Sequence, residues 1–131
     1  MIVAPFEYTD GRGLKTRPAV VISSETYHAS RRELIIAAVT SNTERVLLGD
    51  HIIARWHEAG LRRPSIATAI VRTITQDMID RRLGRLSNED LSGVKRGLGL
   101  ALDLSHQPLA ERCVQTSHIN SFVSHVAATA P

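Results

Sequence analysis

The chain has 131 residues, of which 43% are hydrophobic and 22% charged, so it fits one globular domain and lacks the charge excess of a disordered chain. Its formal net charge of +3 favours a polyanionic partner only modestly, although all but two of its 16 basic residues are arginine, whose planar fork binds phosphate. The longest apolar run, residues 34 to 39, is far too short to span a bilayer and the single cysteine excludes an internal disulfide, so we expect a cytoplasmic protein without a membrane segment.

The first 41 residues predict three strands. Residues 1 to 8 are apolar and partly β-branched, and a cluster of turn-forming residues follows them. Residues 15 to 24 predict a second strand, with Pro18 near its start, where proline does not interrupt a sheet ladder. Residues 33 to 41 are almost continuously apolar, which indicates a central strand covered on both faces. The polar residues 24 to 32 are expected to hold a short helical turn.

The expected elements become shorter beyond residue 42. Residues 51 to 54 predict a strand, and residues 56 to 59 predict a helical turn that Gly60 ends. The β-branched run of residues 65 to 74 predicts a longer strand. Short strands therefore dominate this part of the chain.

A helix is predicted for residues 88 to 104, because apolar side chains recur there at helical spacing. Ser87 and Asp90 resemble a capping box at its start. Three glycines weaken the prediction, since each costs up to about 1 kcal/mol relative to alanine inside a helix. These are Gly93, Gly97 and Gly99. Residues 105 to 131 lose this periodicity, so we expect a domain of residues 1 to 104 and a C-terminal tail.

Six segments carry a resemblance to a known family. In chain order they are PFEYTDG (5 to 11), KTRPAVVISS (15 to 24), IIAAVTS (35 to 41), EAGLRRPS (58 to 65), IVRTI (70 to 74) and RRLGRLS (81 to 87). Their order and spacing resemble the MazF/PemK-type toxins of type II toxin–antitoxin systems. The resemblance implies a mainly β protein of the α+β class, an SH3-like twisted antiparallel barrel with a C-terminal helix. It also implies a homodimer.

The function implied by this resemblance is metal-independent, sequence-selective cleavage of single-stranded RNA through attack by the ribose 2′-hydroxyl. No cofactor is expected. The implied partners are the RNA and a cognate antitoxin, with DNA reached only indirectly through the antitoxin. The alternative is a non-catalytic or degenerate toxin on the same barrel, which binds its antitoxin or poisons gyrase as CcdB relatives do. The chain opens without the Gly-Asp pair usual in the family, which favours this alternative.

Metal-free RNA cleavage needs groups that orient the 2′-hydroxyl, move protons and stabilise the added negative charge on phosphorus. By the resemblance, Arg17 is the catalytic arginine, and a permanently charged guanidinium suits anion stabilisation better than proton abstraction. Thr40 matches the family's catalytic threonine or serine, with Ser41 as a secondary candidate. Without the family, these are a surface arginine, a strand end and a turn cap. Asp10 is the nearest acid in the first loop, but it is typical of a turn.

Five further basic residues are expected to line the RNA path, because phosphate contacts position a strand and arginine planes stack on bases. They are Arg12, Lys15, Arg62, Arg63 and Arg72. Arg72 ranks above Arg62 and Arg63, since a β-branched run holds it in place. Each alone is also typical of a solvated surface charge, and a genome rich in G and C explains the arginine excess equally well. The nearby arginines at 81, 82 and 85 fit RNA, the antitoxin or the fold equally.

Aromatic and histidine side chains give weaker signals. Phe6, Tyr8 and Trp56 are able to stack on bases, although core packing is the better interpretation for each. The six histidines have no cysteine or acidic partner at ligand spacing, so no metal site is predicted.

Overall fold

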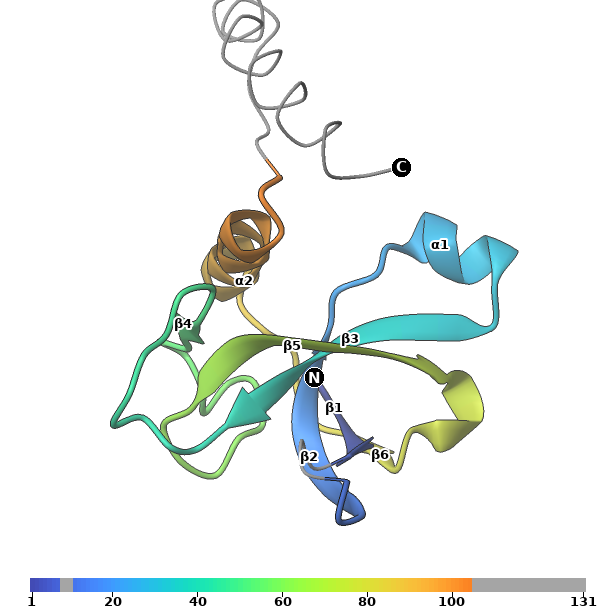
Figure 1. Ribbon diagram of the computed structural model, residues 1–131, viewed down its shortest axis with the longest axis horizontal. Helices are drawn as coiled ribbons and strands as arrows, with labels where there is room; N and C mark the ends of the chain where they lie inside the picture. Colours follow the sequence, from blue (N-terminus) through green and yellow to red (C-terminus); the bar gives the residue numbers. More distant parts are fainter. Residues whose placement is uncertain (8–10, 105–131) are drawn as a thin grey trace, which may run out of the picture.

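The structure is a computed structural model that describes residues 1–7 and 11–104. In this part of the chain a 6-stranded sheet runs in the order β4-β5-β3-β2-β1-β6, and every paired strand is antiparallel to its neighbour (Figure 1). The strands are β1 (Ile2–Glu7), β2 (Leu14–Val21), β3 (Glu33–Thr40), β4 (His51–Ile52), β5 (Ile66–Thr75) and β6 (Arg81–Arg82). The helices are α1 (Glu25–Ser30), the 3-10 helix η1 (Gln76–Met78) and α2 (Asn88–Ala101). The tail from residue 105 lies outside the described residues.

The four longest strands, β1, β2, β3 and β5, lie where the apolar runs predicted them, and α1 lies in the predicted polar stretch. β2 ends three residues earlier than expected. The reason is that the backbone N–H groups of Ile22 and Ser23 both donate to the Ile35 carbonyl oxygen, at 2.9 and 3.3 Å. Ser24 then caps α1, because its hydroxyl accepts from the Tyr27 N–H at 3.1 Å.

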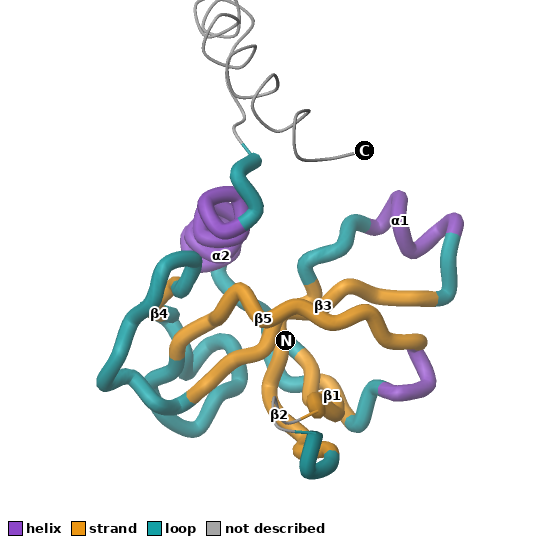
Figure 2. The backbone as a smooth tube through the Cα atoms, in the orientation of Figure 1, coloured by secondary structure: helices purple, strands orange, loops and turns teal. Residues whose placement is uncertain are grey.

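β3 is covered on both faces, as its apolar run predicted. Leu34, Ile36 and Ala38 belong to one buried cluster, and Val39 belongs to a second cluster that includes residues of α2. β3 lies between β2 and β5 in the sheet, so it is also central in position. Figure 2 shows α2 beside β4 and α1 on the opposite side of the molecule, where α1 connects the end of β2 to the start of β3.

Two further predicted boundaries are corrected. β4 has two residues and not four, and the next residues form a turn in which the Ala59 N–H donates to the Arg55 carbonyl at 3.2 Å. α2 ends at Ala101 and not at residue 104, because Asp103 adopts a φ of 56° and the Leu104 N–H donates to the Gly99 carbonyl at 2.7 Å. This is a Schellman-type end, which stops a helix. The short elements η1 and β6 were not predicted.

α2 packs closely on β4 and on the loop before it through two of its glycines. A Cβ atom on Gly97 would lie 2.4 Å from the Gly49 carbonyl oxygen, and one on Gly93 would lie 2.2 Å from the His51 ring. Both distances are far shorter than van der Waals contact, so no larger residue fits without movement. The glycines that weaken α2 as an isolated helix therefore permit its docking.

No helix among the described residues is long and apolar enough to cross a membrane.

Asp90 fixes the start of α2 to the segment after β4. Its side chain is only 2% exposed, and it accepts hydrogen bonds from the Ala54 and Arg55 N–H groups, His51 Nε2 and the Ser87 hydroxyl at 2.9–3.0 Å. The Ser87 hydroxyl also accepts from the Asp90 N–H, as the predicted cap requires. The predicted capping box is wrong in one respect, because the carboxylate bonds a neighbouring segment instead of the N-cap backbone. Burial raises the pKa of Asp90, but these hydrogen bonds outweigh it and lower the pKa to about 2.

Candidate active site

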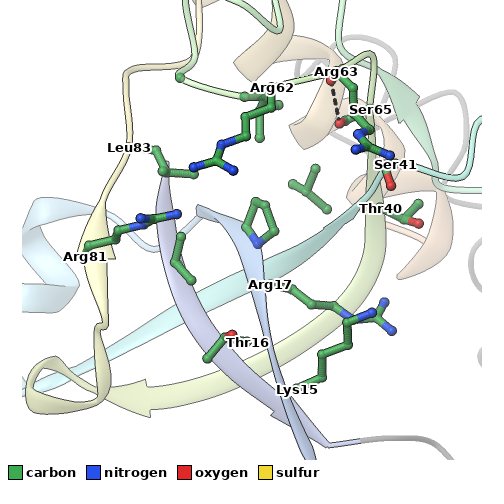
Figure 3. Close-up of a pocket in the computed structure, with 15 residues that line it drawn as sticks. Lys15, Thr16, Arg17, Thr40, Ser41, Arg62, Arg63, Ser65, Arg81 and Leu83 are labelled. Atoms are coloured by element: carbon green, nitrogen blue, oxygen red, sulfur yellow. Dashed lines mark hydrogen bonds between the residues drawn. The ribbon is translucent and has the colours of Figure 1, made fainter.

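A pocket of about 390 Å³ opens where β2 begins and β3 ends (Figure 3). Four parts of the chain line it: β1 with the start of β2, the end of β3, residues 60 to 65, and β6 with Leu83. Its polar lining consists of Lys15, Thr16, Arg17, Thr40, Ser41, Arg62, Arg63, Ser65 and Arg81. Residues that are far apart in the sequence therefore meet at one site.

Arg17 and Thr40 both lie just beyond the end of the β2–β3 ladder. Ala19 on β2 pairs with Ala38 on β3 in the last pair of this ladder, and each of the two residues lies two positions farther along its strand. Both line the same pocket. In Figure 3 the side chains of Lys15 and Arg17 extend toward the end of β3, where Thr40 and Ser41 lie.

The functional groups at this position are available to a ligand. The Thr40 hydroxyl accepts from the Asn42 N–H at 3.2 Å, and this is its one hydrogen bond within the described residues, so its proton remains to be donated. Arg17 is half-buried, and its guanidinium has no hydrogen-bond or ion-pair partner in the described part of the chain. A held but unsatisfied guanidinium is a suitable partner for a phosphate.

The pocket carries one sign of charge. Five cationic side chains line it and no aspartate or glutamate does; the cations are Lys15, Arg17, Arg62, Arg63 and Arg81. In Figure 3 the guanidinium groups of Arg62 and Arg81 extend toward one another from the two sides of the opening. A concave surface lined by one sign of charge focuses the field and attracts ions of the opposite sign. The pocket is therefore suited to a polyanion.

Two glycines bring the walls of the pocket together. A Cβ atom on Gly60, whose φ is +85°, would lie 2.5 Å from the Gly84 nitrogen, so backbone packs directly on backbone here. The Gly84 N–H also donates to the Ala59 carbonyl at 2.9 Å. This contact holds the segment that carries Arg62 beside the segment that carries Arg81, and a larger residue at either position would separate them.

Six of the eight predicted site residues line the pocket: Lys15, Arg17, Thr40, Ser41, Arg62 and Arg63. Arg12 and Arg72 do not. Arg12 lies exposed on the connection between β1 and β2. Arg72 is half-buried, and its Nη1 donates to the Pro5 carbonyl oxygen at 2.5 Å, so the residue placed highest among the RNA-path arginines ties β5 to β1.

The aromatic candidates separate in a similar way. Phe6 is buried in the core and Trp56 is half-buried against it, as expected from core packing. Tyr8 and Asp10 lie outside the described residues, as does the tail that carries the cysteine. Among the described residues no group of three or more histidine, cysteine or acidic side chains is arranged to hold a metal ion.

Three polar residues of the site were not assigned to it from the sequence, and these are Thr16, Ser65 and Arg81. Arg81 enters the pocket because it pairs with Val3 across β1 and β6, and a two-residue strand leaves no periodic signal that distinguishes Arg81 from Arg82. Ser65 is 4% exposed, and its hydroxyl donates to the Arg63 carbonyl at 2.9 Å, which fixes the loop that carries Arg63. A serine after a proline was the available signal for such a turn.

The chain is similar in sequence to known toxins. A family model described as "PemK-like, MazF-like toxin of type II toxin-antitoxin system" matches residues 1–102. Endoribonuclease MazF2 of Mycobacterium bovis is 39% identical over 93 residues, which cover 69% of this chain and 81% of that protein. The family model includes all but the last two of the described residues.

Two solved structures are similar to the fold. The Mycobacterium tuberculosis toxin MazF-mt6 has a TM-score of 0.63 and 20% identity, with 81% of this chain and 100% of that chain covered. An endoribonuclease in complex with its cognate antitoxin from a mycobacterial species has a TM-score of 0.62 and 16% identity, with 81% of this chain and 95% of that chain covered. These likenesses confirm the predicted fold class, a twisted antiparallel SH3-like sheet with a C-terminal helix.

Proposed function

The chain belongs to the family of PemK-like, MazF-like toxins of type II toxin–antitoxin systems, and we propose that it is an endoribonuclease that cuts single-stranded RNA with Arg17 and Thr40 as its catalytic residues. The observation that carries the assignment is that these two side chains line one pocket at the end of the β2–β3 ladder, and that this pocket is lined by five cations and no acid. The endoribonuclease name of the curated relative supports the reaction type.

The reaction proceeds by attack of a ribose 2′-hydroxyl on the adjacent phosphorus. The O2′–P bond forms, the bond from phosphorus to the 5′-oxygen of the next nucleotide breaks, and a 2′,3′-cyclic phosphate remains. Arg17 stabilises the extra negative charge on the phosphorus oxygens, and the Thr40 hydroxyl donates a hydrogen bond that orients the phosphate. The 2′-hydroxyl proton leaves to water in the open pocket, and water returns a proton to the departing 5′-oxygen. Ser41 assists Thr40 from the adjoining position.

The remaining cations position the RNA. Lys15, Arg62, Arg63 and Arg81 contact phosphates on either side of the scissile one, and such contacts fix register without reading bases. Arg12 and Arg72 take no direct part in phosphorus chemistry. The proposed location is the cytoplasm, where RNA is accessible.

Purified protein incubated with single-stranded RNA in EDTA tests this proposal. We expect cleavage that leaves cyclic phosphate ends, and a rate reduced about 100-fold or more in Arg17→Ala, since one lost donor to a developing oxyanion typically costs that much. Arg96→Ala is the matched control, because Arg96 is an exposed arginine of α2 outside the pocket. Intact RNA, or undiminished cleavage by Arg17→Ala, would refute the assignment. Intact RNA with gyrase-linked DNA breaks would instead favour the CcdB-type alternative.

We propose a homodimer as the assembly. Exposed apolar side chains lie on the loop before β4, on β5 and at the end of α2: Leu47, Leu48, Ile70, Leu100 and Leu104. These segments adjoin, since a Cβ atom on Gly49 would lie 3.0 Å from Ala69 Cβ and 3.1 Å from Ala101 Cβ. Apolar surface of this kind is typically covered by another protein surface. Light scattering should give a dimer mass that Leu48→Lys reduces to the monomer mass.

The second proposed partner is a cognate antitoxin that covers the cationic pocket. An acidic, disordered segment that folds on contact would complement these side chains. Binding should weaken as salt rises, because the pocket cations are largely exposed. Any association with DNA would pass through the antitoxin.

A further inference from the structure

A second pocket, of about 680 Å³, lies on the other side of β6 from the candidate active site. β6 pairs Arg81 with Val3 and Arg82 with Ile2. Because neighbouring residues of a strand point to opposite faces, the first pair lines the active-site pocket and the second pair lines the other pocket. Leu83 lines both. The two pockets therefore adjoin across the last strand of the sheet.

The second pocket combines positive charge with an apolar wall. Arg82, Arg85 and His28 line it, and no aspartate or glutamate does. Arg82 and Arg85 are exposed and have no ion-pair or hydrogen-bond partner in the described part of the chain. His28 is held from α1 by a 2.5 Å hydrogen bond between its Nε2 and the Ser23 hydroxyl. Leu34 and other apolar side chains form the wall, so the ligand that fits is an anion with a flat or apolar part.

We propose that the second pocket binds a nucleotide of the same RNA strand that is cut in the first pocket. The proposal rests on the proposed function. Arg82 and Arg85 hold a phosphate that flanks the scissile one, and the attached base lies against the apolar wall. The strand passes over β6, which is the outermost strand of the sheet and has Arg81 on one face and Arg82 on the other. A ligand with regularly repeated phosphates meets cations on both sides of this edge, which favours RNA over a peptide with scattered acids.

The test uses two single-stranded probes made of 2′-O-methyl RNA, which cannot be cut because the attacking hydroxyl is blocked. The long probe reaches across both pockets, and the dinucleotide fills only the candidate active-site pocket. The variant is the double substitution R82A/R85A, and its matched control is K95A/R96A, which removes two exposed cations from α2. We expect R82A/R85A to bind the long probe about tenfold more weakly and to reduce the slope of log K against log salt by about 0.7, since the two arginines hold one phosphate and each single-strand phosphate contact contributes about 0.7. The dinucleotide should bind all proteins equally.

The outcomes separate the two proposals. If the wild type cuts RNA and binds the long probe but R82A/R85A behaves as K95A/R96A does, the second pocket is not an RNA site and the proposed function stands. If the wild type neither cuts RNA nor binds the long probe, the proposed function fails as well. Loss of binding to an acidic peptide with long-probe binding unchanged would overturn the RNA subsite in favour of a protein partner. R82K/R85K should restore most of the affinity for the long probe. Thermal unfolding checks that each variant is folded. If R82A/R85A unfolds at a lower temperature than the wild type, Arg85→Ala replaces it, because Arg85 lies outside β6.

Discussion

Asp90→Ala is expected to destabilise the protein severely, although Asp90 does not line the candidate active site. The buried carboxylate accepts from four donors, the Ala54 and Arg55 N–H groups, His51 Nε2 and the Ser87 hydroxyl. Hydrogen bonds to a charged group contribute about 1.5–3 kcal/mol each, but such values are not additive within one cluster. Breaking a buried polar pair costs about 3–5 kcal/mol, and we expect a loss in this range. That is a large fraction of the roughly 5–15 kcal/mol that holds a domain folded.

The same carboxylate predicts a loss of stability in acid. Its pKa falls from 3.8 to about 2 on folding, so the folded state binds fewer protons than the unfolded state between these values. A lowered folded-state pKa adds stability above the unfolded pKa, and this stability is lost as pH falls through the folded pKa. Since each pKa unit corresponds to about 1.4 kcal/mol, roughly 2 kcal/mol is present at pH 7 and disappears between about pH 4 and pH 2.

Urea unfolding followed by the fluorescence of Trp56, the one tryptophan, measures both effects. Asp90→Asn keeps the size of the side chain but does not titrate, so its stability should fall less than that of the wild type between pH 5 and pH 2. Glu89→Gln is the control, because Glu89 is an exposed acid in the same first turn of α2. A loss below about 1 kcal/mol in Asp90→Ala would mean that the hydrogen-bond cluster is not a stabilising feature. An acid dependence unchanged in Asp90→Asn would refute the linkage argument.

Two further substitutions separate structural from functional residues. Arg72→Ala should lower the free energy of unfolding by about 1 kcal/mol, because Arg72 donates a hydrogen bond to the Pro5 carbonyl outside the pocket, and should leave the rate of RNA cleavage within about threefold of the wild type. A large loss of cleavage at unchanged stability would instead indicate that Arg72 contacts the RNA. Gly97→Ala should lower the free energy of unfolding by about 1–3 kcal/mol in the same assay, since its Cβ would lie 2.4 Å from the Gly49 carbonyl oxygen. A gain in stability, as helix propensity alone predicts, would contradict this packing.

The glycines of α2 show which structural features are predictable from the sequence and which are not. Apolar runs located the long strands, because burial requires apolar residues and β3 is covered on both faces. Helix propensity gave α2 an internal weakness at Gly93 and Gly97, because it considers only the local chain. The reason for these glycines is tertiary: the Gly49 carbonyl and the His51 ring occupy the space where a Cβ atom would lie. The early end of α2 likewise depends on the backbone conformation of Asp103, which no apolar period encodes.

The candidate site was predicted unevenly for a similar reason. The family resemblance indicated Arg17 and Thr40, and both line the pocket beyond the end of the β2–β3 ladder. Arg72 was expected on the RNA path because it lies in a strand, but a strand pattern does not reveal the partner of a long side chain. That partner, the Pro5 carbonyl, is 67 positions away in the sequence. Arg81 was not distinguished from Arg82, because a two-residue strand has no period from which its faces are predictable.

The support of the pocket depends on the Asp90 cluster. The loop that carries Arg62 and Arg63 is held at three points, which are the Asp90 bonds to the Ala54 and Arg55 N–H groups, the Ile53 N–H bond to the Ser65 carbonyl at 3.0 Å, and the contact of Gly60 with Gly84. Removing the first should release one end of that loop while the β2–β3 ladder, beyond which the proposed catalytic residues Arg17 and Thr40 lie, stays intact. The like charges that line the pocket repel one another, and the hydrogen bonds of Asp90 oppose separation of this wall from outside the pocket. The residues proposed to bind RNA and those that keep them in place therefore form separate sets, and the second set includes a buried acid at the start of a helix.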